Sequence, residues 1–318
     1  DGRLYGITSS GGTNGMGTAF YINADGSGFK VLHSFNSTDG GHPYGSLLQG
    51  ADGRLYGMSS VGGPHDRGSV FALNADGTGF ILLSNFAKSE GQTPFAGLMH
   101  GADGRLYGMT TSGGANNYGT VFRIGADGQG FEVLHSFNRS DGGSPYGNLL
   151  QGTDGMLYGM TRGGGPNNYG TVFRIGADGQ GFEVLRRFAG ADGASPHGSL
   201  IQGSDGLLYG MTPWGGAYNM GVVFRMGIDG QGFEKLHSFS GADGAGPLGS
   251  LRQVTDCMLY GMTREGGTNN RGTVFRIGAD GQSFQVLRSF TGTDGANPRS
   301  SLLQGMDGML YGTSPNGG

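Results

Sequence analysis

Asp103-Gly104-Arg105-Leu106-Tyr107-Gly108 is the stretch that decides the fold, because close copies of it recur at one fixed spacing. A copy begins every 51 residues, at Asp1, Asp52, Asp103, Asp154, Asp205, Asp256 and Asp307. An unvarying period over the whole sequence indicates a tandem array of one structural unit. We expect a single domain over 1–318, with repeats at 1–51, 52–102, 103–153, 154–204, 205–255 and 256–306 and a partial repeat at 307–318. Both ends cut through a repeat, so we expect a fragment of a longer chain.

Each repeat contains four short apolar segments that are typical of strands. They are rich in β-branched and aromatic residues, as in 120–124, Thr-Val-Phe-Arg-Ile. No window of helical length has apolar residues at a 3.6-residue period, so we predict almost no helix. We name the strands A to D, with A at 148–151, B at 157–160, C at 171–175 and D at 182–188 in one example.

The turns predict how these strands pair. Asp127-Gly128 lies between a C strand and a D strand, and Asp-Gly is typical of a two-residue type I′ turn with positive φ at both residues. A hairpin centred there places Arg123 opposite Glu132. Directly opposed residues interact, and these positions change together along the array. The pairs are Arg174 with Glu183, Arg225 with Glu234, Arg276 with Gln285, Ala72 with Ile81 and, less obviously matched, Tyr21 with Lys30.

Four antiparallel strands per repeat, with glycine and aromatic residues at fixed places, predict an all-β fold: a β-propeller of four-stranded antiparallel blades. A solenoid is the alternative, but its coils are shorter and have fewer hairpins. The sequence accommodates 25 strands, which form either six or seven blades. Seven is favoured, because in a six-bladed ring the last apolar strand at 309–311 would leave its edge exposed.

The order of motifs in a repeat resembles a known family. Leu-Tyr-Gly-Met-Thr is followed by Gly-Gly, Gly-Thr-Val-Phe, Val-Leu-His-Ser-Phe, Asp-Gly and Pro, and the pattern covers the entire chain. It is similar to the GloVer (Gloeo/Verruco) tandem repeat. The resemblance implies a bacterial protein that is extracellular or at the cell surface after export. It implies no general activity and no catalytic residues.

Composition narrows the possible partners. Glycine makes up 72 of 318 residues, at fixed repeat positions that suit tight turns. The net charge is −4 and no basic stripe occurs, so we expect no nucleic-acid partner. The one cysteine, Cys257, cannot form an intramolecular disulfide, and no apolar run reaches the length of a membrane span. We find no motif for a cofactor, and the oligomeric state stays open.

The loops between strands B and C, and between D and the next A, are the longer ones, and binding sites gather on such loops. The B–C loops carry asparagine and tyrosine. Asparagine there suits turns with left-handed backbone, but amides and aromatic rings together also suit sugar binding. The candidate ligand-binding residues are Asn117, Tyr118, Asn168, Tyr169, Trp214, Tyr218, Asn219, Asn270 and Arg271.

The D–A loops each carry an acid and a proline. We expect these acids, such as Asp141, to cap turns rather than bind metal, because the spacing does not match an EF-hand. One site on strand D alternates between histidine (His33, His135, His237) and arginine (Arg186, Arg288). This exchange argues against a metal ligand and favours a solvated position or one between blades.

A catalytic group would be needed once, so it should lie where the repeat diverges. The second repeat diverges most and carries His65, Asp66 and Arg67, which could act as base and charge neutraliser. Drift of a surface loop is the simpler interpretation. We therefore expect a non-catalytic, exported binding or scaffold protein that engages a glycan or a protein through its B–C and D–A loops. The alternative is a polysaccharide lyase or glycoside hydrolase with an asymmetric site on the same face.

Overall fold

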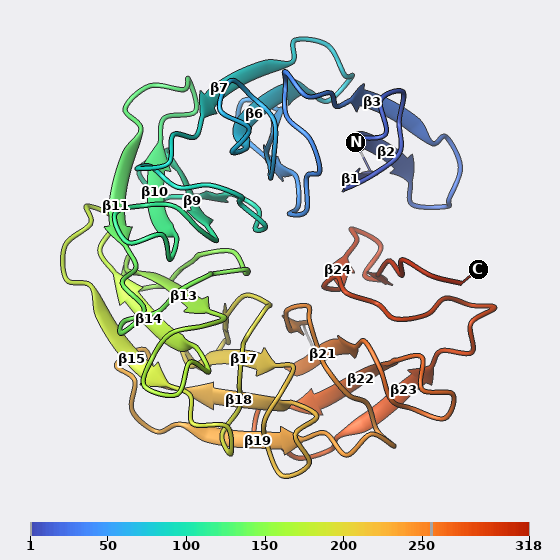
Figure 1. Cartoon of the computed structure of the whole chain (residues 1–318). Coiled ribbons are helices and arrows are strands. Elements are labelled where there is room, and N and C mark those ends of the chain that lie inside the picture. The colour runs from blue at the N-terminus through green and yellow to red at the C-terminus, as the bar shows by residue number, and fades with distance from the viewer. Residues whose placement is uncertain (1, 255–256, 318) are drawn as a thin grey trace. The chain divides into compact units, whose positions relative to one another are not determined.

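A computed structural model describes residues 2–254 and 257–317, which form strands and loops without a helix. Asp1 and Asp256, which begin two copies of the repeat motif, lie outside the described residues. The described residues form 25 strands, the number that the sequence predicts, and Figure 1 labels most of them. The chain divides into two compact units, one of residues 1–139, 143–149 and 176–182 and one of residues 140–142, 150–175 and 183–318.

The first unit holds three antiparallel sheets, with strand orders β1-β2-β3, β4-β5-β6-β7 and β8-β9-β10-β11. Their bounds are β1 (Arg3–Thr8), β2 (Thr18–Asn23), β3 (Lys30–Ser34), β4 (Leu48–Gln49), β5 (Arg54–Ser59), β6 (Ser69–Asn74), β7 (Ile81–Asn85), β8 (Met99–His100), β9 (Leu106–Thr110), β10 (Thr120–Ile124) and β11 (Glu132–Ser136).

The second unit holds four sheets, with orders β12-β13-β14-β15, β16-β17-β18-β19, β20-β21-β22-β23 and β24-β25. Their bounds are β12 (Leu150–Gln151), β13 (Leu157–Thr161), β14 (Thr171–Ile175), β15 (Glu183–Arg187), β16 (Ile201–Gln202), β17 (Leu208–Thr212), β18 (Val222–Met226), β19 (Glu234–Ser238), β20 (Arg252–Gln253), β21 (Met258–Thr263), β22 (Thr273–Gly278), β23 (Gln285–Ser289), β24 (Leu303–Gln304) and β25 (Leu310–Tyr311).

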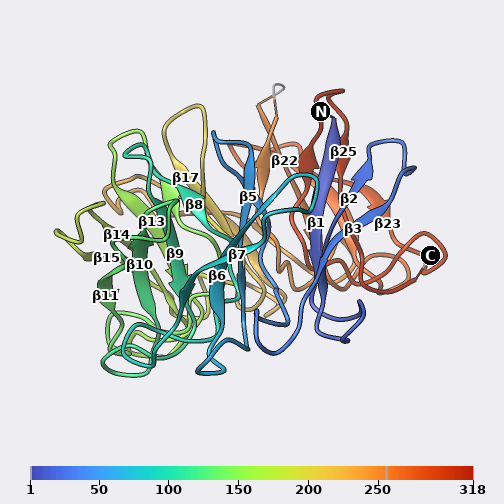
Figure 2. The same ribbon diagram turned by 90° about the horizontal axis from the view of Figure 1, so that it is seen from above.

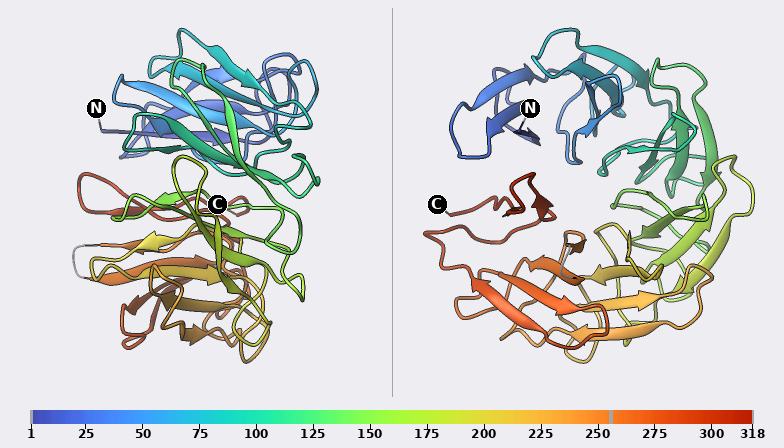
Figure 3. Two further views of the ribbon diagram at one scale, coloured as in Figure 1. Left: turned by 90° about the vertical axis from the view of Figure 1, so that its left-hand side faces the viewer. Right: turned by 180° about the vertical axis from the view of Figure 1, so that it is seen from behind.

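Five sheets have four consecutive antiparallel strands each, which is the blade of a β-propeller, and the predicted fold class is confirmed. Within each blade the loops gather at the two ends of the strands (Figures 2 and 3). The strand at the end of the chain is not left single, because Leu303 of β24 pairs with Tyr311 of β25. The first sheet has three strands and the last has two, so the number of blades, six or seven, stays a prediction.

The predicted pairing register is confirmed in every repeat where it was inferred. Arg123 stands opposite Glu132, and the corresponding pairs in the other repeats match as well. The predicted C strand, 171–175, is β14 without change, whereas the predicted A strand, 148–151, shortens to β12. A bulge between Val121 and Phe122 was not predicted, and it leaves Leu134 without a direct partner on β10.

The predicted type I′ turn is wrong. Gly128 has a φ of 83°, but Asp127 is not among the described residues with positive φ. The N–H of Gly128 donates to Gly125 O at 2.9 Å, and the N–H of Gly125 donates to Gln129 O at 2.8 Å. This pattern is a type I turn closed by a left-handed glycine, which twists the hairpin through a small bulge. The Asp127 carboxylate accepts the N–H of Gln129 at 2.9 Å, which favours this turn.

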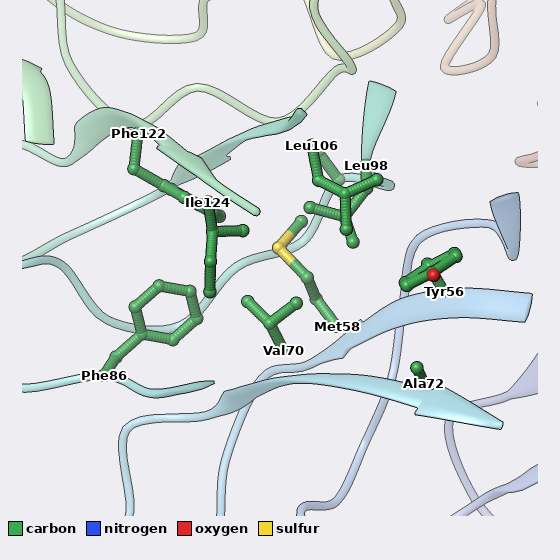
Figure 4. Close-up of a cluster of buried hydrophobic side chains, with 10 residues drawn as sticks. Tyr56, Met58, Val70, Ala72, Phe86, Leu98, Leu106, Phe122 and Ile124 are labelled. Carbon is green, nitrogen blue, oxygen red and sulfur yellow. The ribbon is translucent and has the colours of Figure 1, made fainter. Parts of the chain in front are cut away.

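The core lies between successive sheets. Tyr56 and Met58 of β5 and Val70 of β6 are buried against Leu106 of β9 and Phe122 of β10, as Figure 4 shows. Each interface buries a small cluster of large side chains, at roughly 25 cal/mol per Å² of apolar surface removed from water. A chain that is only 35% hydrophobic can fold in this way, because such an interface between two sheets needs only a small apolar cluster and no large central core is required.

Candidate ligand-binding loops

The B–C loops are built around one bond that recurs along the chain. Asn168 has a φ of 57°, and its Oδ1 accepts the N–H of Gly164 at 2.9 Å. Asparagine tolerates this left-handed backbone and closes the turn with its own side chain. The same geometry holds for Asn117, Asn219 and Asn270. The turn-building role considered for these asparagines is therefore confirmed, and it uses Oδ1 while the Nδ2 donors stay outside this bond.

A second bond joins each B–C loop to the D–A loop that follows. The N–H of Ser195 donates to Tyr169 O at 2.7 Å, and the N–H of Asn297 donates to Arg271 O at 2.8 Å. The equivalent bond in the first unit runs from Ser144 to Tyr118. The two loop types thus lie at the same end of the blade, as the sequence predicts, and their backbones are held in register.

One glycine makes this close approach possible. Gly170 ends the B–C loop with a φ of 89°, and a Cβ atom there would lie 2.1 Å from Thr161 O and 3.0 Å from Pro196 Cδ. A side chain cannot occupy that space without displacing backbone. The proline of the D–A loop is therefore packed directly on the end of the B–C loop.

In the second unit the two loop types enclose a hollow of about 380 Å³. Tyr169 and Trp214 line it, with 41% and 44% of their surface exposed. The N–H of Ala194 donates to Trp214 O at 2.9 Å, which fixes the tryptophan backbone against the D–A loop. We call this space the aromatic hollow; its lining residues are Tyr169, Gly190, Ala194, Ser195, Trp214, Gly215, Gly216 and Asn219.

Three of the nine candidate ligand-binding residues thus meet in the aromatic hollow. The others are placed on their own loops. The Tyr118 ring lies against Gly143, the Arg271 guanidinium lies against Gly292, and Tyr218 is 62% exposed beside the hollow's loop. Sequence reasoning missed Gly190 and Ser195, because they lie on the D–A loop and show their role only once the two loops are brought together.

The catalytic candidates do not form a distinct constellation. Asp66 has a φ of 51°, and its Oδ1 accepts the N–H of Gly62 at 2.8 Å, so it occupies the turn-building place that asparagine holds in other repeats. Arg67 donates to the Gln92 side chain, and His65 is exposed. The divergence of this repeat therefore preserves the loop conformation, and the geometry supplies no acid–base pair.

The D–A acids close their own loops, as the sequence predicts. Asp243 accepts the N–H of Ser240 at 2.8 Å and also faces His237 Nε2 at 2.9 Å. His237 in turn stacks on Phe284 of the next repeat, with ring centroids 3.8 Å apart. Arg186 takes the same place over Phe233. These strand-D residues lie between blades, and the described residues contain no cluster able to hold a metal ion.

At the opposite end of the blades, five Asp-Gly turns of the described residues are tied by a tyrosine to the B strand that follows. Asp154 Oδ2 accepts a hydrogen bond from the Tyr158 hydroxyl at 2.7 Å. Burial of the phenol, together with this bond to a carboxylate, raises the pKa of Tyr158 to about 12. The corresponding hydrogen bond, from the Tyr56 hydroxyl to the Asp52 carboxylate, holds the pKa of Asp52 below its usual range.

Comparison with known proteins agrees with this architecture. A candidate 6-phosphogluconolactonase from Bacteroides uniformis matches over 98% of this chain and 94% of its own, with a TM-score of 0.61 and 16% identity. A second candidate 6-phosphogluconolactonase, from Bacteroides fragilis, matches over 98% of this chain and 92% of its own, with a TM-score of 0.59 and 18% identity. A chain of the nidogen/laminin complex matches over 91% of this chain and 92% of its own, with a TM-score of 0.56 and 12% identity. At these identities the likeness concerns the fold alone.

No curated protein matches the sequence. The fold and its loops define a β-propeller repeat protein. Within that class, the sequence matches the Gloeobacter/Verrucomicrobia repeat over residues 1–151 and 125–318, so the chain belongs to this family. The resemblance inferred from the motifs is thereby confirmed. In the described residues there is no helix long and apolar enough to cross a bilayer.

Proposed function

We propose that this chain is a non-catalytic binding protein that engages glycans through the end of its blades where the B–C and D–A loops lie. The aromatic hollow carries this proposal. In it, the half-exposed aromatic side chains of Tyr169 and Trp214 lie near Ser195, which has a hydroxyl, and Asn219, which has an amide. Several backbone hydrogen bonds fix the loops that carry these residues.

The chemistry of these groups suits a sugar. A pyranose has an apolar face of C–H groups that packs on an aromatic ring, and a rim of hydroxyls that require polar partners. The remaining exposed loop residues, such as Asn168 and Tyr218, extend this surface beyond the hollow. A protein ligand is the second kind of partner that such loops could bind.

We also propose that the protein acts outside the cell or at its surface. Polymeric glycans are abundant there, and the motif pattern is similar to that of exported bacterial proteins. Fractionation of the producing bacterium, with detection in the medium and in the surface fraction, tests this proposal. Recovery in the cytoplasm alone would refute it.

Affinity electrophoresis tests the binding function. The chain is run through gels that contain laminarin, xylan, mannan or pectin, and we expect at least one polysaccharide to retard it. The loop variant combines Tyr169→Met, Trp214→Ser and Tyr218→Asn, each a residue that another repeat carries at the equivalent position. We expect this variant to migrate as if no polysaccharide were present.

The control variant changes the opposite end of the blades, with Gln180→Ser and Gln231→Thr, again residues of other repeats. We expect its retardation to equal that of the unmodified chain. Equal retardation of the loop variant would remove the B–C and D–A loops from the binding surface. Absence of retardation in every gel would contradict glycan binding as such.

A further inference from the structure

We infer, on the basis of the glycan-binding function proposed above, that the aromatic hollow is a subsite for a single neutral pyranose ring. The sequence contains the required combination at one junction between repeats. Along the array, the positions of Tyr169 and Trp214 are filled by Met16 with Val61, Arg67 with Ser112, Tyr118 with Gly163, Met220 with Glu265 and Arg271 with Asn316. Only the junction of Tyr169 with Trp214 supplies two aromatic rings.

Gly190 keeps the hollow open. A Cβ atom at this position would lie 3.4 Å from Cε2 of the Tyr169 ring, so a longer side chain would extend over the ring. The first three repeats carry Ser37, Lys88 and Arg139 at the equivalent position. Arg139 has a φ of 72°, close to the 85° of Gly190, so an arginine occupies this left-handed conformation in one other repeat.

The size and lining of the hollow fit one ring. Its volume of about 380 Å³ is near the lower end of small-ligand sites, which span roughly 300–1,000 Å³. Ser195 supplies a hydroxyl, and its loop is held from behind, where His197 Nδ1 lies 2.8 Å from Ser195 O. Burial lowers the pKa of His197, so it adds no fixed positive charge behind this wall at neutral pH.

The absence of charge in the lining selects against acidic sugars. The eight lining residues include no aspartate, glutamate, histidine, lysine or arginine. Asp192 of the same D–A loop is paired with Arg186, and the ammonium of Lys235 donates to Ala191 O at 2.9 Å. A uronate carboxylate placed in the hollow would lose water without gaining an ionic partner, which is unfavourable.

Trp214 reports on this hollow directly, because it is the single tryptophan of the chain. We expect its fluorescence to shift on titration with one or more of methyl β-D-glucopyranoside, methyl β-D-galactopyranoside and methyl α-D-mannopyranoside. The matching uronide differs from the best neutral glycoside only in a carboxylate at C6. Its affinity should be lower by at least roughly tenfold, a difference of ~1.4 kcal/mol. An unchanged spectrum with all three neutral glycosides, or tighter binding of the uronide, would overturn the inference.

Three single variants test the residues, with binding followed by saturation-transfer NMR on the same glycoside. Gly190→Arg should fill the hollow, Trp214→Ser should remove one face, and Tyr169→Arg should remove the other. Each residue introduced occurs at the equivalent position of another repeat. We expect roughly tenfold weaker binding in each, because Trp214→Ser and Tyr169→Arg each remove a ring contact and Gly190→Arg blocks access to the rings.

Met220→Arg is the matched control, because it places the same residue as Tyr169→Arg at the equivalent position of the next repeat. It should bind the glycoside like the unmodified chain. Trp214→Phe should restore most of the affinity lost in Trp214→Ser, which separates a ring contact from a folding defect. If a polysaccharide retards the chain but Gly190→Arg and Trp214→Ser bind normally, the subsite is refuted and the wider loop surface remains the proposed binding site.

Discussion

The two ends of each blade differ in how they use sequence variation. At the Asp-Gly end the same hydrogen bond recurs, in which a tyrosine hydroxyl donates to the aspartate of the turn. The accepting aspartates are Asp52, Asp103, Asp154, Asp205 and Asp307. At the loop end the backbone bonds recur as well, but the exposed side chains change from repeat to repeat. Tyr169 is replaced by methionine or arginine elsewhere in the array.

This difference separates scaffold from specificity. Residues that bond to the backbone, such as Asn168 and Asp66, are exchanged only for residues that preserve the turn. Residues that point out of the loops carry no such restriction and can differ at every junction. A binding site in a repeat array is therefore best sought where unrestricted positions coincide, as Tyr169, Gly190 and Trp214 do.

The largest effect should come from the glycine on which the loop end is built. In Gly170→Ala the new Cβ atom would lie 2.1 Å from Thr161 O, and the backbone has a φ of 89°. We expect the free energy of unfolding to fall by ~3–5 kcal/mol, through clash and strain together. Urea denaturation followed by circular dichroism measures this change.

Gly155→Ala is the matched control at the other end of the blade. Gly155 has a φ of 81°, but no atom lies within 4 Å of the position its Cβ would take. The free energy of unfolding of Gly155→Ala should fall by only ~1–2 kcal/mol, the cost of placing a side chain on left-handed backbone. Equal losses in the two variants would mean that close packing of the loops adds nothing to the stability of that end.

The second prediction concerns the tyrosines of the Asp-Gly end. Tyr56, Tyr158 and Tyr209 each have a pKa raised to about 12 by burial, and then by the bond to their aspartate. In the unfolded chain tyrosine ionises near pH ~10. The folded state therefore keeps protons that the unfolded state loses, so the free energy of unfolding should fall between pH 10 and about 12.

Tyr158→Phe should destabilise the chain by ~1.5–3 kcal/mol at neutral pH, because Asp154 loses a donor. It should also make the alkaline decline less steep, since one titrating phenol is gone. Urea titrations at several pH values above 9 measure both effects. A decline as steep as that of the unmodified chain would show that Tyr158 does not ionise with the raised pKa.

Most of the framework was predictable because its signals are local and repeated six times. The joint change of Arg123 with Glu132 and of Ala72 with Ile81 along the array is enough to predict the register next to the turn, and the strands pair in that register as far as the bulge. The turn type was misjudged because Asp127 can favour either turn, and its bond to Gln129 decides between them. The hollow could be predicted only in part, because Gly190 and Trp214 belong to different repeats and meet through loop–loop packing.

A smaller effect is expected from the cross-strand pairs at the Asp-Gly end. Arg174 Nε donates to Glu183 Oε2 at 2.9 Å, and the carboxylate is half exposed. Reversal of the pair with Arg174→Glu and Glu183→Arg should cost less than the two single changes summed, by ~0.2–1 kcal/mol. Strictly additive losses in this double-mutant cycle, measured at low and high salt, would show that the pair contributes no coupling energy.

The smallest change in stability should come from the turn-building asparagines, and it sharpens the distinction between scaffold and ligand contact. Asn168→Gly and Asn219→Gly lose the same bond to a backbone N–H, at 2.9 Å in each loop. Glycine accepts the positive φ, and Gly15 already occupies this place in the first repeat, so we expect each variant to lose only ~0.5 kcal/mol. The two variants should differ in sugar binding, because Asn219 lines the aromatic hollow and Asn168 does not. Glycoside affinity should therefore fall in Asn219→Gly and stay unchanged in Asn168→Gly, while equal loss in both would indicate that binding sites recur from blade to blade.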